Sequence, residues 1–145
     1  MQIIHLSQEN PTGRSCCISI FVIMPYMIDA LYKEEILEHY KNPQHFGKLP
    51  KFSTSSHQYN PFCGDDIELF VLYSNQKVKD ISFVGTGCAI CIAAASILTE
   101  FAKNKTKKEL TKLNDEDMLG LLNIEVSESR KKCALLAFSV LKDCL

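Results

Sequence analysis

The chain has 145 residues, of which 46% are hydrophobic and 23% are charged, and its net charge at pH 7 is −1. This length and composition are typical of one soluble globular domain with a hydrophobic core. A chain so close to neutral has no bulk attraction for nucleic acid or for an anionic membrane, so neither is expected as a partner.

Seven cysteines are many for this length. Their number is odd, and their spacing does not resemble the disulfide framework of a small secreted domain. We therefore expect a reducing compartment, the cytoplasm, in which the thiols are kept for metal or sulfur chemistry.

Residues 1–25 fit poorly with the rest of the chain. They contain the turn signal NPTG at residues 10–13, followed by an apolar run from Cys16 to Ile28. The run is too short to span a bilayer, and it lacks the small-residue cleavage site of a secretory signal peptide. We expect residues 1–25 to be an extension, either disordered or not translated, and residues 26–145 to form a single domain.

A periodic pattern predicts a helix over residues 26–41, followed by a loop. Apolar residues recur there at steps of three and four, as in an amphipathic helix. They are Ile28, Leu31, Tyr32, Ile36, Leu37 and Tyr40. Asn42 and Pro43 end this helix, because proline disfavours a helical conformation in the residue before it.

Three strands and several helices are predicted for the rest. Residues 54–60, 67–73 and 78–84 are candidate strands, and the second has apolar residues at every other position. The short link 74–77 predicts an antiparallel hairpin. Helices are predicted at 88–103 and 127–144, and capping-box patterns occur at 106–109 and 114–117. The order indicates an α+β fold: a small three-stranded antiparallel sheet, with an N-terminal helix and C-terminal helices packed on one face.

Three segments carry the candidate chemistry. Cys63 and Asp65 lie in NPFCGD at residues 60–65, and Cys88 follows two glycines in GTGC at residues 85–88. The second strand begins just after Cys63, and the third ends just before Cys88. Pairing of these strands therefore brings Cys63, Asp65 and Cys88 into one neighbourhood, with Cys88 at a helix start that favours a thiolate.

Cys133 lies in the first turns of the last helix, on the same face as Ala137, Val140 and Cys144. Burial as a small hydrophobic residue accounts for Cys144 and remains an equal alternative to metal binding for Cys133. Three cysteines and one aspartate, Cys63, Asp65, Cys88 and Cys133, form a plausible four-ligand set for a soft or borderline metal.

These segments resemble the IscU/SufU/NifU N-terminal family of iron–sulfur scaffolds. The resemblance covers about residues 27–145 and rests on three cysteine motifs in order, together with HYKNP at residues 39–43. It implies a scaffold that assembles a transient [2Fe–2S] cluster and passes it to apo iron–sulfur proteins, with sulfur from a cysteine desulfurase. It also implies that Cys63, Cys88 and Cys133 are ligands or sulfur acceptors, with Cys63 and Cys133 as acceptor candidates, and that Asp65 is an exchangeable oxygen ligand.

The chain also departs from the IscU branch. Lys132 stands where that branch has a histidine, as in the SufU branch, and the chaperone-binding motif of IscU is absent. The spacing from Cys88 to Cys133 lacks the insertion usual in SufU proteins, so the chain is SufU-like by motif only. The leading alternative is a Zn²⁺-bound sulfurtransferase partner that accepts persulfide sulfur from a cysteine desulfurase. The scaffold hypothesis predicts no enzyme activity, and the sequence leaves the oligomeric state open.

Two further hypotheses use the cysteines differently. Cys91 makes a C-x-x-C pair with Cys88, which is the spacing of thiol–disulfide oxidoreductases, but the βαβ context of that motif is missing and burial of Cys91 is favoured. The other hypothesis is a zinc site that only stabilises the domain. The single histidines His39, His45 and His57 are expected to be surface or capping residues, and the lysines of residues 103–112 a solvated helix surface.

Overall fold

The structure is a computed structural model that describes the backbone of residues 20–145 and the side chains of residues 30–145. The predictions for residues 1–19 lie outside the described residues. The elements are α1 (Ile20–Lys41), β1 (Thr54–Asn60), β2 (Asp65–Ser74), β3 (Lys77–Thr86), α2 (Ala89–Ala102), α3 (Lys107–Thr111), α4 (Asp115–Leu122) and α5 (Glu128–Asp143). The predicted α+β class is confirmed.

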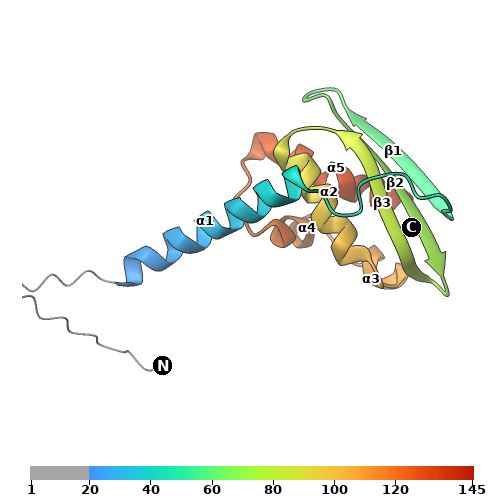
Figure 1. Ribbon diagram of the computed structural model, residues 1–145, viewed down its shortest axis with the longest axis horizontal. Helices are drawn as coiled ribbons and strands as arrows, with labels where there is room; N and C mark the ends of the chain where they lie inside the picture. Colours follow the sequence, from blue (N-terminus) through green and yellow to red (C-terminus); the bar gives the residue numbers. More distant parts are fainter. Residues whose placement is uncertain (1–19) are drawn as a thin grey trace, which may run out of the picture.

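The three strands form one antiparallel sheet in the order β1-β2-β3, as predicted (Figure 1). The β1–β2 register places Asn60 opposite Asp65, and the β2–β3 register places Asp66 opposite Thr86. The turn after β1 and the end of β3 therefore lie at the same edge of the sheet. The predicted strands 67–73 and 78–84 were each slightly shorter than β2 and β3.

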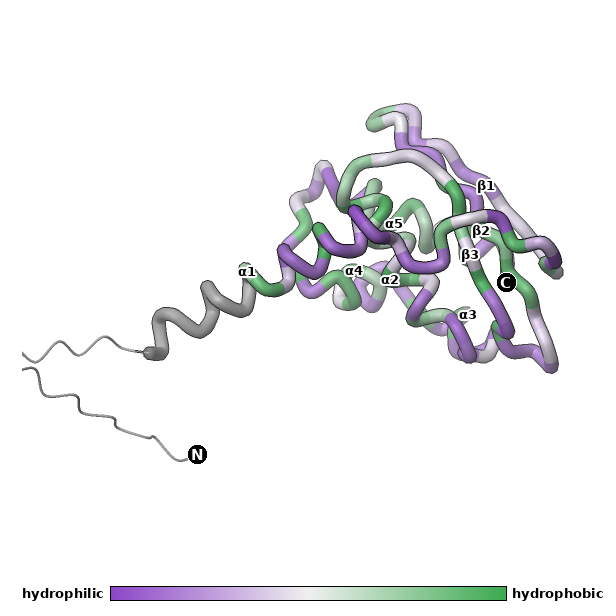
Figure 2. Tube along the Cα trace, in the orientation of Figure 1, coloured by the Kyte–Doolittle hydropathy of each residue, from purple (hydrophilic) through white to green (hydrophobic). Residues whose placement is uncertain are grey.

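The helices pack on one face of this sheet. Figure 1 shows α2 and α5 along the left-hand side of the sheet, with α1 against α2, and Figure 2 shows hydrophobic residues concentrated in α2 and α5. The alternating side chains Ile67, Leu69 and Val71 of β2 are fully buried in this core. A period of two directs these side chains to one face, where burial of apolar surface stabilises the layer.

The other face of the sheet is covered locally by the loop between α1 and β1. The ring of Phe52 lies 5.2 Å from that of Phe70 in β2, and the Lys48 ammonium lies 5.2 Å from the centre of the Phe70 ring. Phe70 is fully buried although its side chain does not belong to the helix-covered core. The loop thus covers part of this face of the sheet, and the sequence pattern did not predict that cover.

Two features of the helices bear on the predictions. The α1 helix begins at Ile20, before the predicted start at Tyr26, because the apolar run preceding Tyr26 continues the helical backbone. Both predicted capping boxes are present, one pairing Thr106 with Glu109 and the other Asn114 with Asp117. Each box satisfies N–H groups that a helix start leaves without an intrahelical partner.

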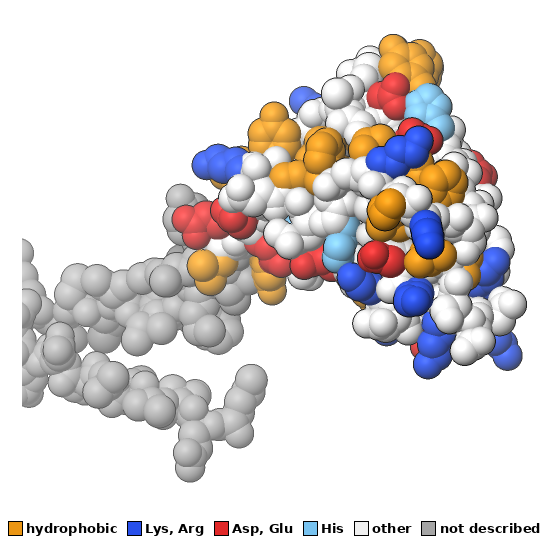
Figure 3. Space-filling model, turned by 45° about the vertical axis from the view of Figure 1, so that its right-hand side comes forward, with side chains coloured by type: hydrophobic (Ala, Val, Ile, Leu, Met, Phe, Trp, Pro, Cys, Tyr) orange, Lys and Arg blue, Asp and Glu red, His pale blue; other side chains and the backbone are white. Residues whose placement is uncertain are grey.

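The lysines of residues 103–112 lie on the surface, as expected. Figure 3 shows basic side chains gathered over the part of the molecule that contains α3. Lys103 pairs with Asp80 at 3.3 Å, and the Lys107 ammonium lies 4.0 Å from the centre of the Tyr73 ring. Among the described helices, none is both long enough and apolar enough to cross a membrane.

Candidate metal and sulfur site

A tight turn joins β1 to β2 and presents Cys63. The Oδ1 atom of Asn60 accepts a hydrogen bond from the Phe62 N–H at 3.1 Å, and the Gly64 N–H donates to the Asn60 carbonyl at 2.8 Å. Gly64 has a φ of +71°, a conformation that glycine adopts without steric cost. The turn leaves Cys63 exposed and buries Asp65, the first residue of β2, to 1% exposure.

The carboxylate of Asp65 is the centre of the site. Its Oδ2 atom accepts a hydrogen bond from the Cys63 thiol at 2.8 Å, and its Oδ1 atom accepts one from the Cys88 backbone N–H at 3.0 Å. Burial raises the pKa of Asp65, but hydrogen bonds from the Cys63 and Cys133 thiols and the Cys88 N–H bring it below its usual value. These donors therefore keep a buried carboxylate ionised at neutral pH.

Cys133 reaches the same place from α5. Its thiol donates to the Cys63 sulfur at 3.3 Å, and its side chain is 2% exposed. Burial and hydrogen bonds with Asp65 and Cys63 raise the pKa of Cys133 above that of a free thiol. Cys133 is thus packed in the core and also lies close to the other candidate ligands.

The structure brings three of the four predicted site residues together. One potential ligand atom each from Cys63, Asp65 and Cys133 lies within 4.8 Å of the others. Cys88 is adjacent as the residue that precedes α2, and its amide binds Asp65, but its thiol falls outside this group. The predicted neighbourhood of Asp65 and Cys88 is therefore confirmed at the level of the backbone.

Gly87 fits closely against the site and against Cys91. A Cβ atom at Gly87 would lie 2.8 Å from Asp65 Oδ1 and 3.1 Å from Cys91 Sγ. The Cys91 side chain is fully buried, as expected, and burial raises the pKa of its thiol. A protonated, inaccessible thiol is a poor nucleophile, so Cys91 is not an attacking thiol.

The sequence profile of the NifU-like N-terminal domain matches residues 31–145. The chain belongs to this family. The match covers all of β1–α5 and the end of α1, and with it every candidate ligand. The family resemblance carried by the three cysteine segments is thereby confirmed.

Several curated relatives of this NifU-like domain have scaffold names. An iron–sulfur cluster assembly scaffold protein IscU 1 of Archaeoglobus fulgidus is 30% identical over 112 residues, covering 77% of this chain and 72% of the relative. The zinc-dependent sulfurtransferase SufU of Bacillus subtilis is 33% identical over 132 residues, covering 79% and 89%. Relatives thus bear the names of both functions considered for this chain.

A solved structure has the same fold. It is that of a putative scaffold protein for the SUF system from Fervidobacterium islandicum, which is 26% identical and covers 81% of this chain and 96% of its own. The TM-score is 0.67. The arrangement of sheet and helices that places Cys63, Asp65 and Cys133 together is therefore shared with an experimental structure.

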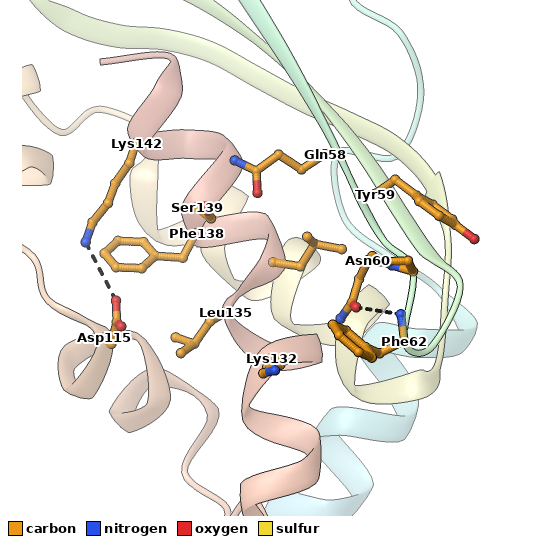
Figure 4. Close-up of a pocket in the computed structure, with 12 residues that line it drawn as sticks. Gln58, Tyr59, Asn60, Phe62, Asp115, Lys132, Leu135, Phe138, Ser139 and Lys142 are labelled. Atoms are coloured by element: carbon orange, nitrogen blue, oxygen red, sulfur yellow. Dashed lines mark hydrogen bonds and ion pairs between the residues drawn. The ribbon is translucent and has the colours of Figure 1, made fainter.

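A groove opens beside Phe62, the residue before Cys63, in this NifU-like domain. It has a volume of about 420 Å³ and lies between β1, the turn after it, and α4 and α5 (Figure 4). Phe62 at its rim is 84% exposed, and the Lys132 ammonium lies 4.8 Å from the centre of the Phe62 ring. Lys132 thus contacts the turn through Phe62, the residue before Cys63.

One polar pair near the site has no signal in the sequence pattern. His57 Nε2 and Asp66 Oδ1 lie 2.6 Å apart across β1 and β2, with both side chains about half exposed. Of the other described histidines, His39 bonds to the hydroxyl group of Ser96 and His45 to that of Thr99, both in α2. Among the described residues, no histidine joins the group of potential ligands, and the His39 side chain, at 13% exposure, is more buried than the expected surface role requires.

The donor set fits both occupants considered for this domain. Thiolates and a carboxylate are accepted by Zn²⁺, and thiolates hold iron–sulfur clusters. An ionised Asp65 and the thiols of Cys63 and Cys133 offer one hard and two soft ligands, and Cys88, whose amide binds Asp65, is the adjacent thiol-bearing residue. A carboxylate binds the iron of a cluster less well than a thiolate, so this set suits a group that is later released.

Proposed function

We propose that this NifU-like domain is a scaffold on which iron and sulfide form a [2Fe–2S] cluster that is passed to apo iron–sulfur proteins. The observation that carries the proposal is the convergence of Cys63, Asp65 and Cys133 within 4.8 Å at one edge of the sheet. Names of relatives such as the scaffold protein of A. fulgidus support it. The cluster is cargo, so the domain itself turns over no substrate.

Each candidate ligand has a distinct role in this proposal. Cys63, the exposed thiol, accepts sulfur from a cysteine desulfurase: its thiolate attacks the terminal sulfur of the donor persulfide, and the donor cysteine leaves as a thiolate. Cys88 and Cys133 complete the thiolate ligands, and Asp65 supplies the oxygen ligand that opens for an acceptor thiol.

A second candidate function keeps the same residues. In it, Cys63, Asp65, Cys88 and Cys133 hold Zn²⁺, and the domain is a sulfurtransferase partner of the desulfurase, like the relative named a zinc-dependent sulfurtransferase. The observation that favours it is Lys132, whose ammonium lies over the Phe62 ring where the IscU branch offers histidine. Bound zinc would keep the thiols deprotonated, and four protein ligands would make a closed site.

Anaerobic reconstitution tests the scaffold function. The protein is given ferrous iron, cysteine, a thiol reductant and a cysteine desulfurase, and we expect the visible absorption of an iron–sulfur cluster, followed by transfer to apo-ferredoxin. Retention of one tight zinc ion without cluster formation, combined with Cys63-dependent acceleration of the desulfurase, would replace the scaffold function with the sulfurtransferase function.

Asp65→Ala is expected to slow cluster transfer about tenfold, which corresponds to about 1.4 kcal/mol in the barrier. The reason is that removal of the weakest ligand removes the natural point of opening for an acceptor thiol. The measurement is the rate at which apo-ferredoxin gains its cluster. Asp66→Ala is the matched control, because Asp66 is the neighbouring carboxylate but pairs with His57 on the surface. Equal transfer rates in the two variants would remove Asp65 from the mechanism.

We further propose that residues 1–25 are an extension that this function does not need. The family profile begins at residue 31, and Ile36 is the buried hydrophobic residue among the described side chains of α1. A chain that starts at Met24 is expected to keep its metal content and to lose less than about 1 kcal/mol of unfolding free energy. Ile36→Ala, which empties a core position, should cost about 2–4 kcal/mol by comparison. A loss of several kcal/mol on truncation would place the missing residues in the core.

A further inference from the structure

Cys91 is a thiol that the proposed function does not use. It lies in the first turn of α2, three residues after Cys88, and its side chain is fully buried. Among the described residues, no hydrogen bond to its thiol is present. Burial alone is ordinary for a free cysteine, so a further role for this thiol depends on where it lies relative to Asp65.

Cys91 lies on the same side of Asp65 as the start of α2. Asp65 uses Oδ2 for the Cys63 thiol and Oδ1 for the Cys88 N–H, so Oδ1 is the oxygen turned toward α2. A Cβ atom at Gly87 would lie 2.8 Å from that Oδ1 and 3.1 Å from Cys91 Sγ. The carboxylate and the Cys91 sulfur therefore flank one point, which is free of a side chain because residue 87 is glycine.

We propose that Cys91 is a reserve ligand of this site, which takes the place of Asp65 when the carboxylate leaves the metal. The inference rests on the proposed function, since Cys63, Cys88 and Cys133 hold the metal in both states. The ligand class is a soft or borderline ion, Zn²⁺ or the iron of a cluster. As the Cys91 sulfur–metal bond forms, the Asp65 oxygen–metal bond breaks, the thiol proton passes to water, and no electron is transferred.

The exchange gives the site two states that differ in how firmly they hold the metal. With Asp65 bound, one ligand is a carboxylate and the metal is open to exchange. With Cys91 bound, four thiolates surround the metal, and the fourth is closed to solvent by the core. Slow transfer in Asp65→Ala would then reflect the entry of Cys91, and not merely the loss of an oxygen ligand.

Cobalt(II) binding tests the proposal without any activity assay. The sulfur-to-cobalt charge-transfer absorption grows with the number of bound thiolates. We expect Asp65→Ala to absorb about one third more strongly than the unmodified protein, as a change from three thiolates to four requires. Adding Cys91→Ser to Asp65→Ala should remove the increase. Adding Cys144→Ser should leave it, because that buried thiol lies beside Thr54 at the far end of β1.

The possible outcomes separate this proposal from the proposed function. Equal absorption in Asp65→Ala with and without Cys91→Ser, or no increase in Asp65→Ala, would overturn the role of Cys91 alone. No charge-transfer absorption in the unmodified protein would overturn the metal site and this proposal together. Asp65→Asn, which keeps the shape of the side chain and is a weaker ligand, takes the place of Asp65→Ala if the alanine variant does not fold.

Discussion

Replacing Cys63 with serine is expected to reduce cluster formation and persulfide acceptance to background while the protein remains folded. Cys63 is exposed at the tip of the turn, whereas Cys133 is 2% exposed, so Cys63 is the thiol that a sulfur donor reaches first. A hydroxyl group can still donate to Asp65 but is neither the nucleophile of thiol–disulfide exchange nor a ligand that iron–sulfur clusters favour. The unfolding free energy should change by less than about 1 kcal/mol, as is usual at exposed positions.

The matched control for this variant is Cys144→Ser. Cys144 is a buried free thiol at the end of α5, and burial raises its pKa to about 11. This change should lower stability modestly and leave cluster formation intact. Anaerobic reconstitution followed by visible absorption compares the two variants, with thermal unfolding as the check on folding. A Cys63→Ser protein that still forms and transfers a cluster at the original rate would exclude Cys63 from the site.

The sheet could be predicted because its pattern is local. Alternation in residues 67–73 and the short link to the next strand predict an antiparallel hairpin, and the β2–β3 register confirms it. The same pairing explains why Asp65 and Cys88 could be placed together from the sequence, since Asp65 then lies at the edge where β3 ends. The contacts that cover Phe70 could not be predicted, because they come from the irregular loop between α1 and β1, in which apolar residues do not recur at a regular spacing.

Side-chain contacts at the site were harder to predict than its backbone. The pair of His57 and Asp66 depends on the register, in which His57 lies opposite Glu68 and is therefore diagonal to Asp66. A shift of β1 by one residue would place the His57 side chain on the opposite face from Asp66, and no local pattern in β1 sets that register. The Cys88 thiol is a similar case, since strand pairing places its backbone but not the direction of its sulfur.

Gly85→Ala is expected to cost more than about 3 kcal/mol of unfolding free energy, a range reached by steric overlap in a packed core. A Cβ atom at residue 85 would lie 2.0 Å from the Asp66 carbonyl oxygen and 3.0 Å from Ile67 Cδ1. Both obstacles belong to β2, and the closer one is backbone, so no rotation of a side chain relieves the overlap. Gly85 also has a φ of +158°, a conformation that other residues rarely adopt, and this backbone strain increases the cost of alanine.

Gly120→Ala gives the opposite expectation and is the control. Gly120 lies within α4, and nothing stands within 4 Å of its Cβ position, so alanine should stabilise the helix by about 0.5–1 kcal/mol. Urea unfolding of the two variants compares them directly, and similar midpoints would refute the assigned overlap. Because Gly85 pairs with Ile67 two residues after Asp65, separation of β3 from β2 there would also carry the Cys88 N–H away from the carboxylate. Gly85→Ala should therefore weaken cobalt binding under conditions in which the protein is still folded, whereas Gly120→Ala should not.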